Sequence, residues 1–197
     1  MLENIKLFCH SSIKLIGSKV IYIDPYKIED EAHDADFVLC THEHFDHYSK
    51  EDIEKVSKKE TIIIAPIDES GIIKVVPKIK YEIEGLKFET TYAYNIDKEF
   101  HKKESNWVGY IINLDDKKYY IAGDTDNIPE IQKIECDVAF IPVGGTYTMN
   151  KNEAAELAKS IKAAVIIPTH YGLIVGEKED GVRFAELVKD KNVKILI

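Results

Sequence analysis

The sequence predicts an α+β fold of two mixed β-sheets with helices on the outside. Up to residue 122, short runs rich in β-branched and aromatic residues are separated by Gly, Pro, Asp and Asn signals, a pattern typical of paired strands. In the last third, apolar runs alternate with helical patterns. With 197 residues and 45% hydrophobic content, the chain is expected to form one domain over residues 1–197 with a sizeable core.

The expected elements follow from these local signals. Gly17-Ser18 and Asp24-Pro25 punctuate the first three strands, as in an antiparallel meander. Ser49, with an acid three residues later, is a plausible helix cap, and Asn150 with Glu153 forms a capping-box pattern. Helices are expected near residues 151–162 and 182–189. The expected strands are residues 5–8, 12–16, 20–24, 36–41, 61–65, 72–76, 80–83, 87–92, 107–114, 117–122, 138–143, 165–168 and 193–197.

The strongest functional signal is the hexapeptide His42-Glu43-His44-Phe45-Asp46-His47, directly after an apolar run. In an extended segment, side chains two residues apart share a face, with a rise of about 3.3 Å per residue. His42 and His44 can therefore close on one ion. Asp46 and His47 are neighbours, so the chain must turn here for both side chains to reach the same region. The sequence predicts a strand, a ligand loop and a helix around a metal site.

This H-x-H-x-D-H pattern resembles the signature of the metallo-β-lactamase-fold hydrolases, and later segments agree in order and kind. Gly123-Asp124-Thr125 is similar to the family's bridging-carboxylate turn, and Thr169-His170-Tyr171-Gly172 lies where the family places its last histidine. The resemblance spans nearly the whole chain and is nearest to the compact, lactonase-like branch, whose strand ends in Asp-Pro as here. It implies a four-layer αβ/βα sandwich.

The resemblance also implies a dinuclear metal site. Two histidines of the hexapeptide would serve the first ion, the rest of the loop and the last histidine would serve the second, and the carboxylate of the Gly-Asp-Thr turn would bridge them. The implied metal ligands are His42, His44, Asp46, His47, His101, Asp124 and His170.

His101 is the least secure member of this set. Of the histidines outside the matched motifs, only His101 lies between the ligand loop and Asp124, where the family's remaining first-ion ligand belongs. Its surroundings, residues 97–104, are a charged stretch that could be a solvated loop. Asn95 and Tyr94, just before it, are the fallback donors from the same region.

The implied activity is hydrolysis of a small ester, lactone or phosphodiester by a hydroxide that bridges two divalent ions. Asp46 would be the catalytic residue, orienting the nucleophile and accepting its proton. Nitrogen and carboxylate ligands suit Zn²⁺ best, while Mn²⁺ or Fe²⁺ remain compatible. Two alternatives stay open. Di-iron oxidoreductases of this fold use Glu where this chain has His44, which disfavours that class, and the intact ligand set disfavours a non-catalytic metal-binding protein.

Other residues have two interpretations each. His10 either lines the pocket or is a hydrogen-bonded turn residue, and Asp24 either forms a turn or orients a ligand histidine. Cys40 is either a core thiol or approaches the metals. Gly144-Gly145 either makes a tight turn or aims N–H groups at a substrate oxygen. Tyr171 is expected near the metals if His170 is.

Three more residues are expected to be structural. Trp107 is expected in the core, with the floor of the pocket as the alternative. His33 is expected on the surface among acidic residues, and Asp126 as a local cap.

Charge and composition narrow the partners. The net charge is −9, with 26 basic against 35 acidic residues, which opposes nucleic-acid binding and favours a small-molecule substrate. The first residues lack the features of a signal peptide, and no apolar run approaches the ~20 residues that span a bilayer. A cytoplasmic protein without a membrane partner is expected. The three cysteines, odd in number and widely spaced, suit reduced thiols. The oligomeric state is not specified.

Overall fold

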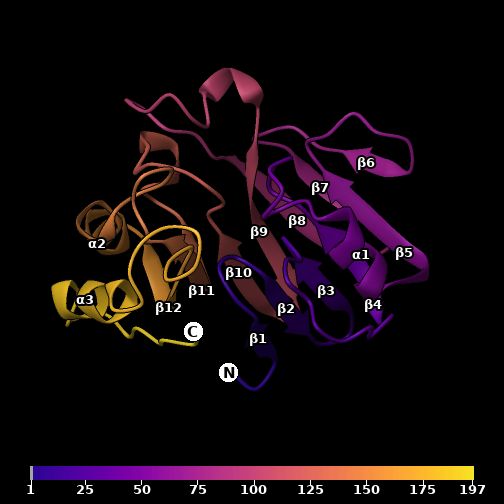
Figure 1. Cartoon of the computed structure of the whole chain (residues 1–197), viewed down its shortest axis with the longest axis horizontal. Helices are drawn as coiled ribbons and strands as arrows, with labels where there is room; N and C mark the ends of the chain where they lie inside the picture. The colour runs from indigo at the N-terminus through magenta and orange to yellow at the C-terminus, as the bar shows by residue number, and fades with distance from the viewer. Residues whose placement is uncertain (1) are drawn as a thin grey trace. The chain divides into compact units, whose positions relative to one another are not determined.

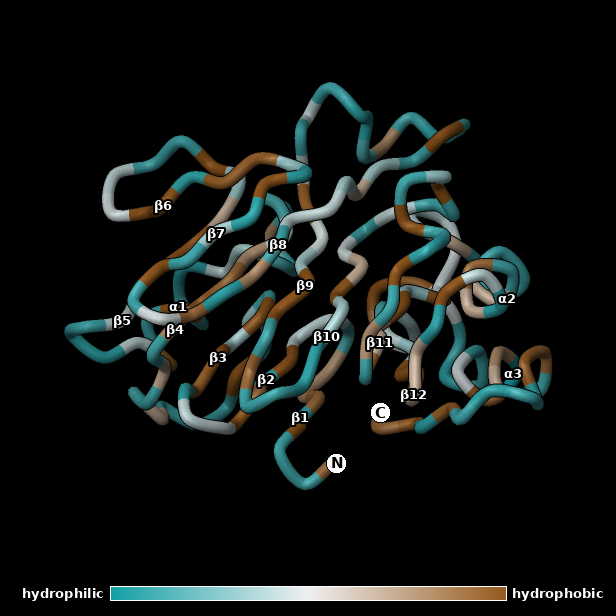
Figure 2. The backbone as a smooth tube through the Cα atoms, turned by 180° about the vertical axis from the view of Figure 1, so that it is seen from behind, coloured by the Kyte–Doolittle hydropathy of each residue, from teal (hydrophilic) through white to brown (hydrophobic). Residues whose placement is uncertain are grey.

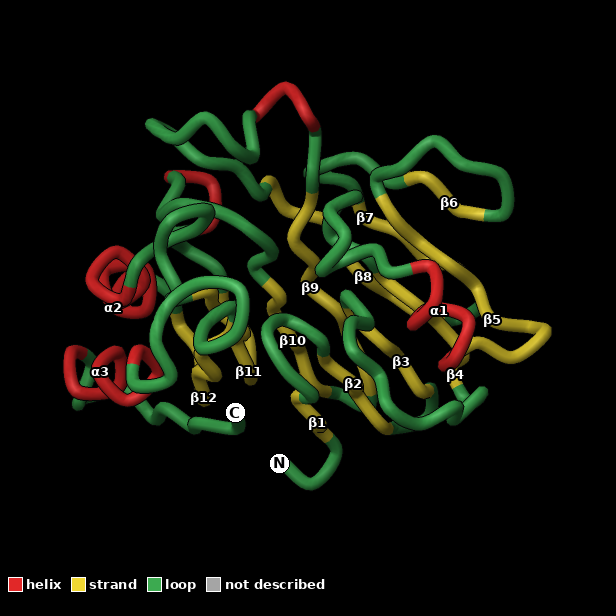
Figure 3. Tube along the Cα trace, viewed as in Figure 1, coloured by secondary structure: helices red, strands yellow, loops and turns green. Residues whose placement is uncertain are grey.

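The computed structural model describes residues 2–197, and the chain divides into two compact units. The first unit ends at Val75, and the second runs from Val76 to Leu196. Each unit is built on one six-stranded sheet, drawn as arrows in Figure 1 and in yellow in Figure 3. Both sheets contain parallel and antiparallel pairs, so the two mixed sheets predicted from the sequence are confirmed.

The sheet of the first unit has its strands in sequence order, from β1 to β6. The first three strands pair antiparallel, as the meander predicts, and the remaining pairs are parallel. The strands are β1 (Ile5–Leu7), β2 (Ile13–Ile16), β3 (Val20–Ile23), β4 (Ala35–Leu39), β5 (Ser57–Ala65) and β6 (Ile72–Lys74). Helix α1 (Lys50–Val56) leads into β5, and its cap Ser49 accepts a hydrogen bond from the backbone N–H of Asp52 as predicted.

The sheet of the second unit has the order β12-β11-β10-β9-β8-β7. The strands from β7 to β10 pair antiparallel, and β10, β11 and β12 pair parallel. The strands are β7 (Lys80–Ile83), β8 (Leu86–Tyr92), β9 (Val108–Leu114), β10 (Lys117–Ile121), β11 (Glu135–Pro142) and β12 (Lys162–Thr169). Short 3₁₀ turns η1 (Lys103–Ser105) and η2 (Pro129–Ile131) interrupt the loops.

Helices α2 (Lys151–Ser160) and α3 (Asp180–Leu187) pack together beside β12 in the second unit (Figure 1). The predicted capping box starts α2, because the Asn150 side chain accepts backbone N–H groups and Glu153 reaches back to the Asn150 N–H. The buried faces of Ala155, Leu157 and Phe184 join the apolar side chains of β10 to β12 in one cluster. This cluster fixes the positions at which the parallel strands end.

Several predicted boundaries differ from the structure. Residues 193–197 are not a strand, and Val193 makes only an isolated bridge with Ile166. The chain pairs through the polar segments ahead of three predicted strands, so β5, β11 and β12 start earlier than predicted. Strand pairing satisfies backbone hydrogen bonds whether the side chains are polar or apolar. A pattern of hydrophobic residues therefore does not show where a strand begins. None of the helices in the described chain has the length and apolar character needed to cross a membrane.

Candidate metal centre

The hexapeptide follows β4 at the carboxyl edge of the first sheet. The backbone N–H groups of His47 and Tyr48 both bond to the carbonyl of His44, at 2.9 and 2.8 Å, and this turn separates the two halves of the motif. His42 Nε2 lies 3.2 Å from His44 Nδ1. That separation suits two nitrogens directed at one ion, as the extended-strand argument predicts. The turn then delivers Asp46 and His47, both buried.

Asp24, which follows β3 at the same edge, holds His47. Its Oδ2 lies 2.8 Å from His47 Nδ1, and the Thr41 backbone N–H and hydroxyl donate to its two oxygens at 2.7 and 2.9 Å. Burial raises the pKa of the Asp24 carboxyl group, and its bonds with His47 and Thr41 act in the opposite direction. Asp24 therefore orients the His47 ring, as one of its two interpretations predicts.

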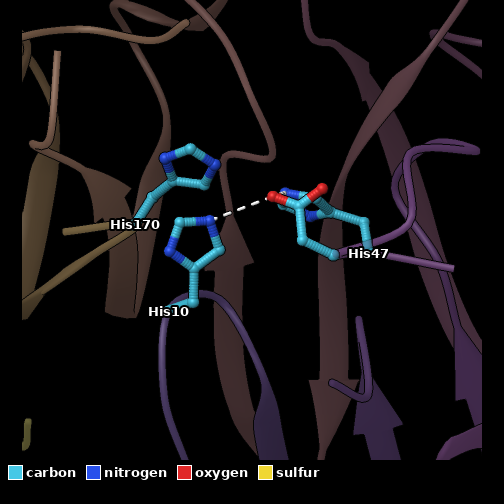
Figure 4. Close-up of side chains that lie close together, drawn as sticks. His10, His47 and His170 are labelled. Carbon is cyan, nitrogen blue, oxygen red and sulfur yellow. Dashed lines mark hydrogen bonds and ion pairs between the residues drawn. The ribbon is translucent and has the colours of Figure 1, made fainter. Parts of the chain in front are cut away.

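His10 reaches this group from the loop between β1 and β2. Its Nε2 lies 3.1 Å from Asp46 Oδ2, the contact drawn as a dashed line in Figure 4, where His47 is also labelled. The same carboxylate oxygen lies 3.6 Å from His47 Nε2. One ligand atom each from His10, Asp46 and His47 lies within 4.8 Å of the others. His10 therefore lies against the candidate donors Asp46 and His47 as well as in a turn.

The second unit gathers three donors at the carboxyl edge of its sheet. Asp124 follows β10, and His170, labelled in Figure 4, follows β12 directly. Asp124 Oδ2 lies 3.2 Å from His101 Nε2 and 3.0 Å from His170 Nε2. All three residues are buried. A carboxylate oxygen between two imidazole nitrogens is a donor arrangement suited to a divalent ion.

His101 is buried although its loop is charged. Figure 2 colours most of the loop between β8 and β9 teal, yet the exposed fraction of His101 is only 3%. Its ring packs edge-on against Trp107, with centroids 5.2 Å apart. Of the fallback donors, Tyr94 is bonded elsewhere, and Asn95 uses its amide nitrogen while its buried Oδ1 has no hydrogen-bond partner. The Asn95 side-chain amide donates to the carbonyls of Phe100 and Tyr147 at 3.1 and 2.7 Å, and the Tyr94 hydroxyl bonds to Glu130.

Asp126 ties this loop to the turn that carries Asp124. Its Oδ2 accepts the backbone N–H of Ile96 at 2.9 Å, its Oδ1 accepts the Lys98 ammonium group, and its own N–H donates to the Tyr94 carbonyl at 2.9 Å. The sequence suggested only a local cap here. Its spacing of two residues from Asp124 was the available signal, but the partner loop lies almost thirty residues earlier in the chain.

Gly144 and Gly145 form a tight turn after β11. The Gly145 N–H bonds to the Met149 carbonyl at 3.0 Å, so it is used within the turn and not aimed at a ligand. A Cβ at Gly144 would lie 2.0 Å from the backbone oxygen of His170. Glycine is required here because any side chain would push away the strand end that carries His170.

The remaining candidates are structural. Cys40 is buried in the apolar cluster of the first unit, and burial raises the pKa of its thiol well above the usual range. Tyr171 turns from His170 into the core of the second unit, where its hydroxyl would clash with any side chain at position 181. His33 is exposed and bonds to the Ser57 carbonyl at 2.8 Å. No disulfide joins the cysteines of the described chain.

Comparison with known proteins gives one consistent family. The family model described as "Beta-lactamase superfamily domain" matches residues 4–170. A metal-dependent hydrolase of Thermoplasma acidophilum is 31% identical over 218 residues, covering 100% of this chain and 96% of the relative.

Solved structures agree. A protein of Parabacteroides distasonis, named as a candidate metal-dependent hydrolase, has a TM-score of 0.84 and 31% identity, covering 97% of this chain and 91% of its own. A Thermotoga maritima protein, named as a candidate zinc-dependent hydrolase of the metallo-β-lactamase superfamily, has a TM-score of 0.67 and 25% identity, covering 97% of this chain and 96% of its own. These likenesses confirm the predicted fold class.

Proposed function

The chain belongs to the metallo-β-lactamase superfamily, and on that premise we propose that it is a hydrolase that uses two divalent ions to cleave a small ester, lactone or phosphodiester. Two relatives from Thermoplasma species are likewise named metal-dependent hydrolases. The observation that carries the proposal is the chemistry of the buried donors: imidazole nitrogens and carboxylate oxygens gathered at the carboxyl edges of parallel strands, where α/β proteins bind their ligands.

We assign the donors by the order of the motifs along the chain. The proposed ligands are His42, His44 and His101 for the first ion, Asp46, His47 and His170 for the second, and Asp124 as the bridge. The contact of Asp124 Oδ2 with both His101 and His170 supports the bridging role. The family model runs through both compact units without interruption, which supports a single hydrolase domain over residues 1–197.

The donors fit divalent transition ions. Neutral imidazole and carboxylate are the ligands that Zn²⁺ prefers outside thiolate sites, and Cys40, the nearest thiol in sequence, lies in the apolar core. We propose Zn²⁺ as the usual metal, with Mn²⁺ or Fe²⁺ as compatible substitutes because of the carboxylates.

When bound, the two ions supply Lewis-acid chemistry that polarises the scissile group and makes water a nucleophile at neutral pH. In this proposal Asp46 accepts the proton of the attacking water and returns it to the leaving oxygen when the ester bond breaks. Asp24 keeps His47 in the orientation that directs Nε2 outward. The proposed donors are buried except His44, which is half-buried.

We further propose a small-molecule substrate, with neither nucleic acid nor membrane as a partner, and a cytoplasmic location. The support is the acidic balance of the chain.

Metal analysis and a substrate screen test this proposal. Protein prepared without chelator should carry two divalent ions per chain, measured by mass spectrometry of the metals. It should hydrolyse one of p-nitrophenyl acetate, a simple lactone or bis(p-nitrophenyl) phosphate with Zn²⁺ or Mn²⁺. Dialysis against a chelator should abolish turnover, and returning the metal should restore it. A reproducible metal content near zero under metal-replete conditions would contradict the dinuclear assignment.

A further inference from the structure

His10 lies outside every motif that the family resemblance uses, yet it is fully buried beside the ligand loop. Its backbone adopts a left-handed conformation, with φ of 53°, which is uncommon for a residue with a side chain. A turn maintains this conformation: the Ser12 N–H bonds to the Cys9 carbonyl at 2.8 Å, and the Phe8 N–H bonds to the Ser12 carbonyl at 2.9 Å. The loop thus holds one imidazole at a fixed place.

That imidazole contacts Asp46 on one side. His10 Nε2 is within hydrogen-bond distance of Asp46 Oδ2, at 3.1 Å, while His47 Nε2 lies at 3.6 Å from the same oxygen, beyond hydrogen-bond range. His10 Nε2 is therefore close enough to hydrogen-bond to the Asp46 carboxylate, whereas His47 Nε2 is not. The His10 contact has the geometry of a hydrogen bond, which suits an N–H donated to the carboxylate, and the His47 contact does not.

A carboxylate has about four lone-pair positions, so it can accept this N–H and still bind an ion and receive a proton. Carboxylates that bind metals are themselves commonly held by hydrogen bonds, and removing such a partner typically costs about 10–100-fold in metal affinity or activity. Without the bond, the Asp46 side chain could rotate about its Cβ–Cγ bond, and its oxygens would leave the positions that the ion and the attacking water require.

We infer that His10 is a positioning residue, whose Nε2–H holds the Asp46 carboxylate in its binding orientation without itself being a metal ligand. This inference rests on the proposed function, because it concerns the carboxylate assigned to the second ion. It adds a residue some thirty positions ahead of the hexapeptide to the working parts of the site.

A matched pair of amides tests the inference. In His10→Gln, the side-chain amide nitrogen can occupy the place of Nε2, whereas in His10→Asn it can reach only the place of Nδ1. Both variants are polar and neutral, and circular dichroism would establish that both fold. His33→Asn, at an exposed histidine, is the control.

The first readout is metal binding, measured with Zn²⁺ in competition with a chromophoric chelator. We expect His10→Asn to weaken the second Zn²⁺ equivalent by about 10-fold or more, and His10→Gln to stay within about threefold of the wild type. The visible spectrum of the Co²⁺-saturated protein should keep its intensity in both variants, because the ligands themselves are unchanged.

The second readout is turnover of the p-nitrophenyl substrate that the wild type hydrolyses. At saturating metal, His10→Asn should lower kcat by about 10-fold or more with little change in KM, and His10→Gln should restore most of it. Equal metal affinity and equal kcat in all three proteins would overturn the inference. A Co²⁺ spectrum showing a lost ligand in His10→Asn would overturn it too, by making His10 a ligand. A wild type that binds no Zn²⁺ would instead refute the proposed function, and the inference with it.

Discussion

At the scale of single residues, the orientation of each imidazole decides whether it can bind a metal. His47 illustrates this, because Asp24 accepts from Nδ1 and so leaves Nε2 for an ion. Asp24 lies 23 residues earlier in the chain, after a different strand. The hexapeptide therefore predicts candidate donors, while residues outside it determine how their side chains are oriented.

Asp46→Asn tests whether Asp46 takes part in the reaction or only binds metal. Asparagine keeps the size and one oxygen but removes the negative charge and the proton acceptor. We expect a modest loss of metal and a fall in kcat of about 10²-fold or more, measured on whichever screened substrate the wild type hydrolyses. Full turnover in the variant would assign proton transfer to the metals alone or to another group such as Asp124.

His101→Ala tests the ligand with the weakest sequence support. Its Nε2 contacts the proposed bridging carboxylate at 3.2 Å, so its removal should lower the metal content toward about one equivalent per chain and reduce turnover. Metal mass spectrometry after gel filtration measures this. His33→Ala, at an exposed histidine, should leave both quantities unchanged. Wild-type metal content in the His101 variant would move the ligand to Asn95 or to solvent.

The sequence predicted which candidate donors would gather where they lie close together or directly after an apolar strand, as His42 and His170 do. The contacts of His10 and Asp24 could not be predicted, because they join a lone polar residue to a segment 20 to 40 residues away. His101 could be placed only by the family's order of ligands. Its burial depends on Trp107 and on the fold of its loop, which a charged stretch does not reveal.

At the scale of elements, parallel pairing brings the donors together. The strands β10, β11 and β12 run parallel, so the residues that follow them share one edge of the sheet. Asp124 and His170 follow the two outer members of this trio, and the Gly144 turn between them leaves room for the backbone of His170. Hydrophobic runs predicted where most strands lie along the chain, but not their order in each sheet. The segment 193–197, predicted as a strand, meets the edge strand β12 only through the bridge between Val193 and Ile166.

Asp126→Ala tests the attachment of the His101 loop. The substitution removes the acceptor for the Ile96 N–H and for the Lys98 ammonium, and hydrogen bonds to charged groups contribute about 1.5–3 kcal/mol each. We expect amide hydrogen exchange in residues 96–102 to speed up by about tenfold or more, since about 1.4 kcal/mol corresponds to a factor of ten.

Asp97→Ala is the control for this change, because Asp97 is an exposed acid in the same loop. It should leave the exchange rates near those of the wild type. Unchanged exchange in the Asp126 variant would mean that Asn95, which bonds to the Phe100 and Tyr147 carbonyls, holds the loop without help.

At the scale of the whole molecule, the proposed ligands are spread along the chain from His42 to His170. The hexapeptide belongs to the first unit, and Asp124 with its two histidine contacts belongs to the second. This agrees with a family model that extends from residue 4 to residue 170.

Charge over the whole molecule predicts the class of partner. The chain carries −9, and many of its lysines are paired with carboxylates, so they offer little to a phosphate backbone. These pairs include Lys14–Asp34, Lys58–Asp36, Lys103–Glu130 and Lys151–Asp180. Because nucleic-acid affinity depends on neutralised phosphates, fluorescence anisotropy should detect no binding of labelled duplex DNA or precursor tRNA at physiological salt and micromolar protein. Binding of either nucleic acid that weakens as the salt concentration is raised would contradict this prediction. It would show a basic surface despite the negative net charge and would make nucleic acid a candidate substrate.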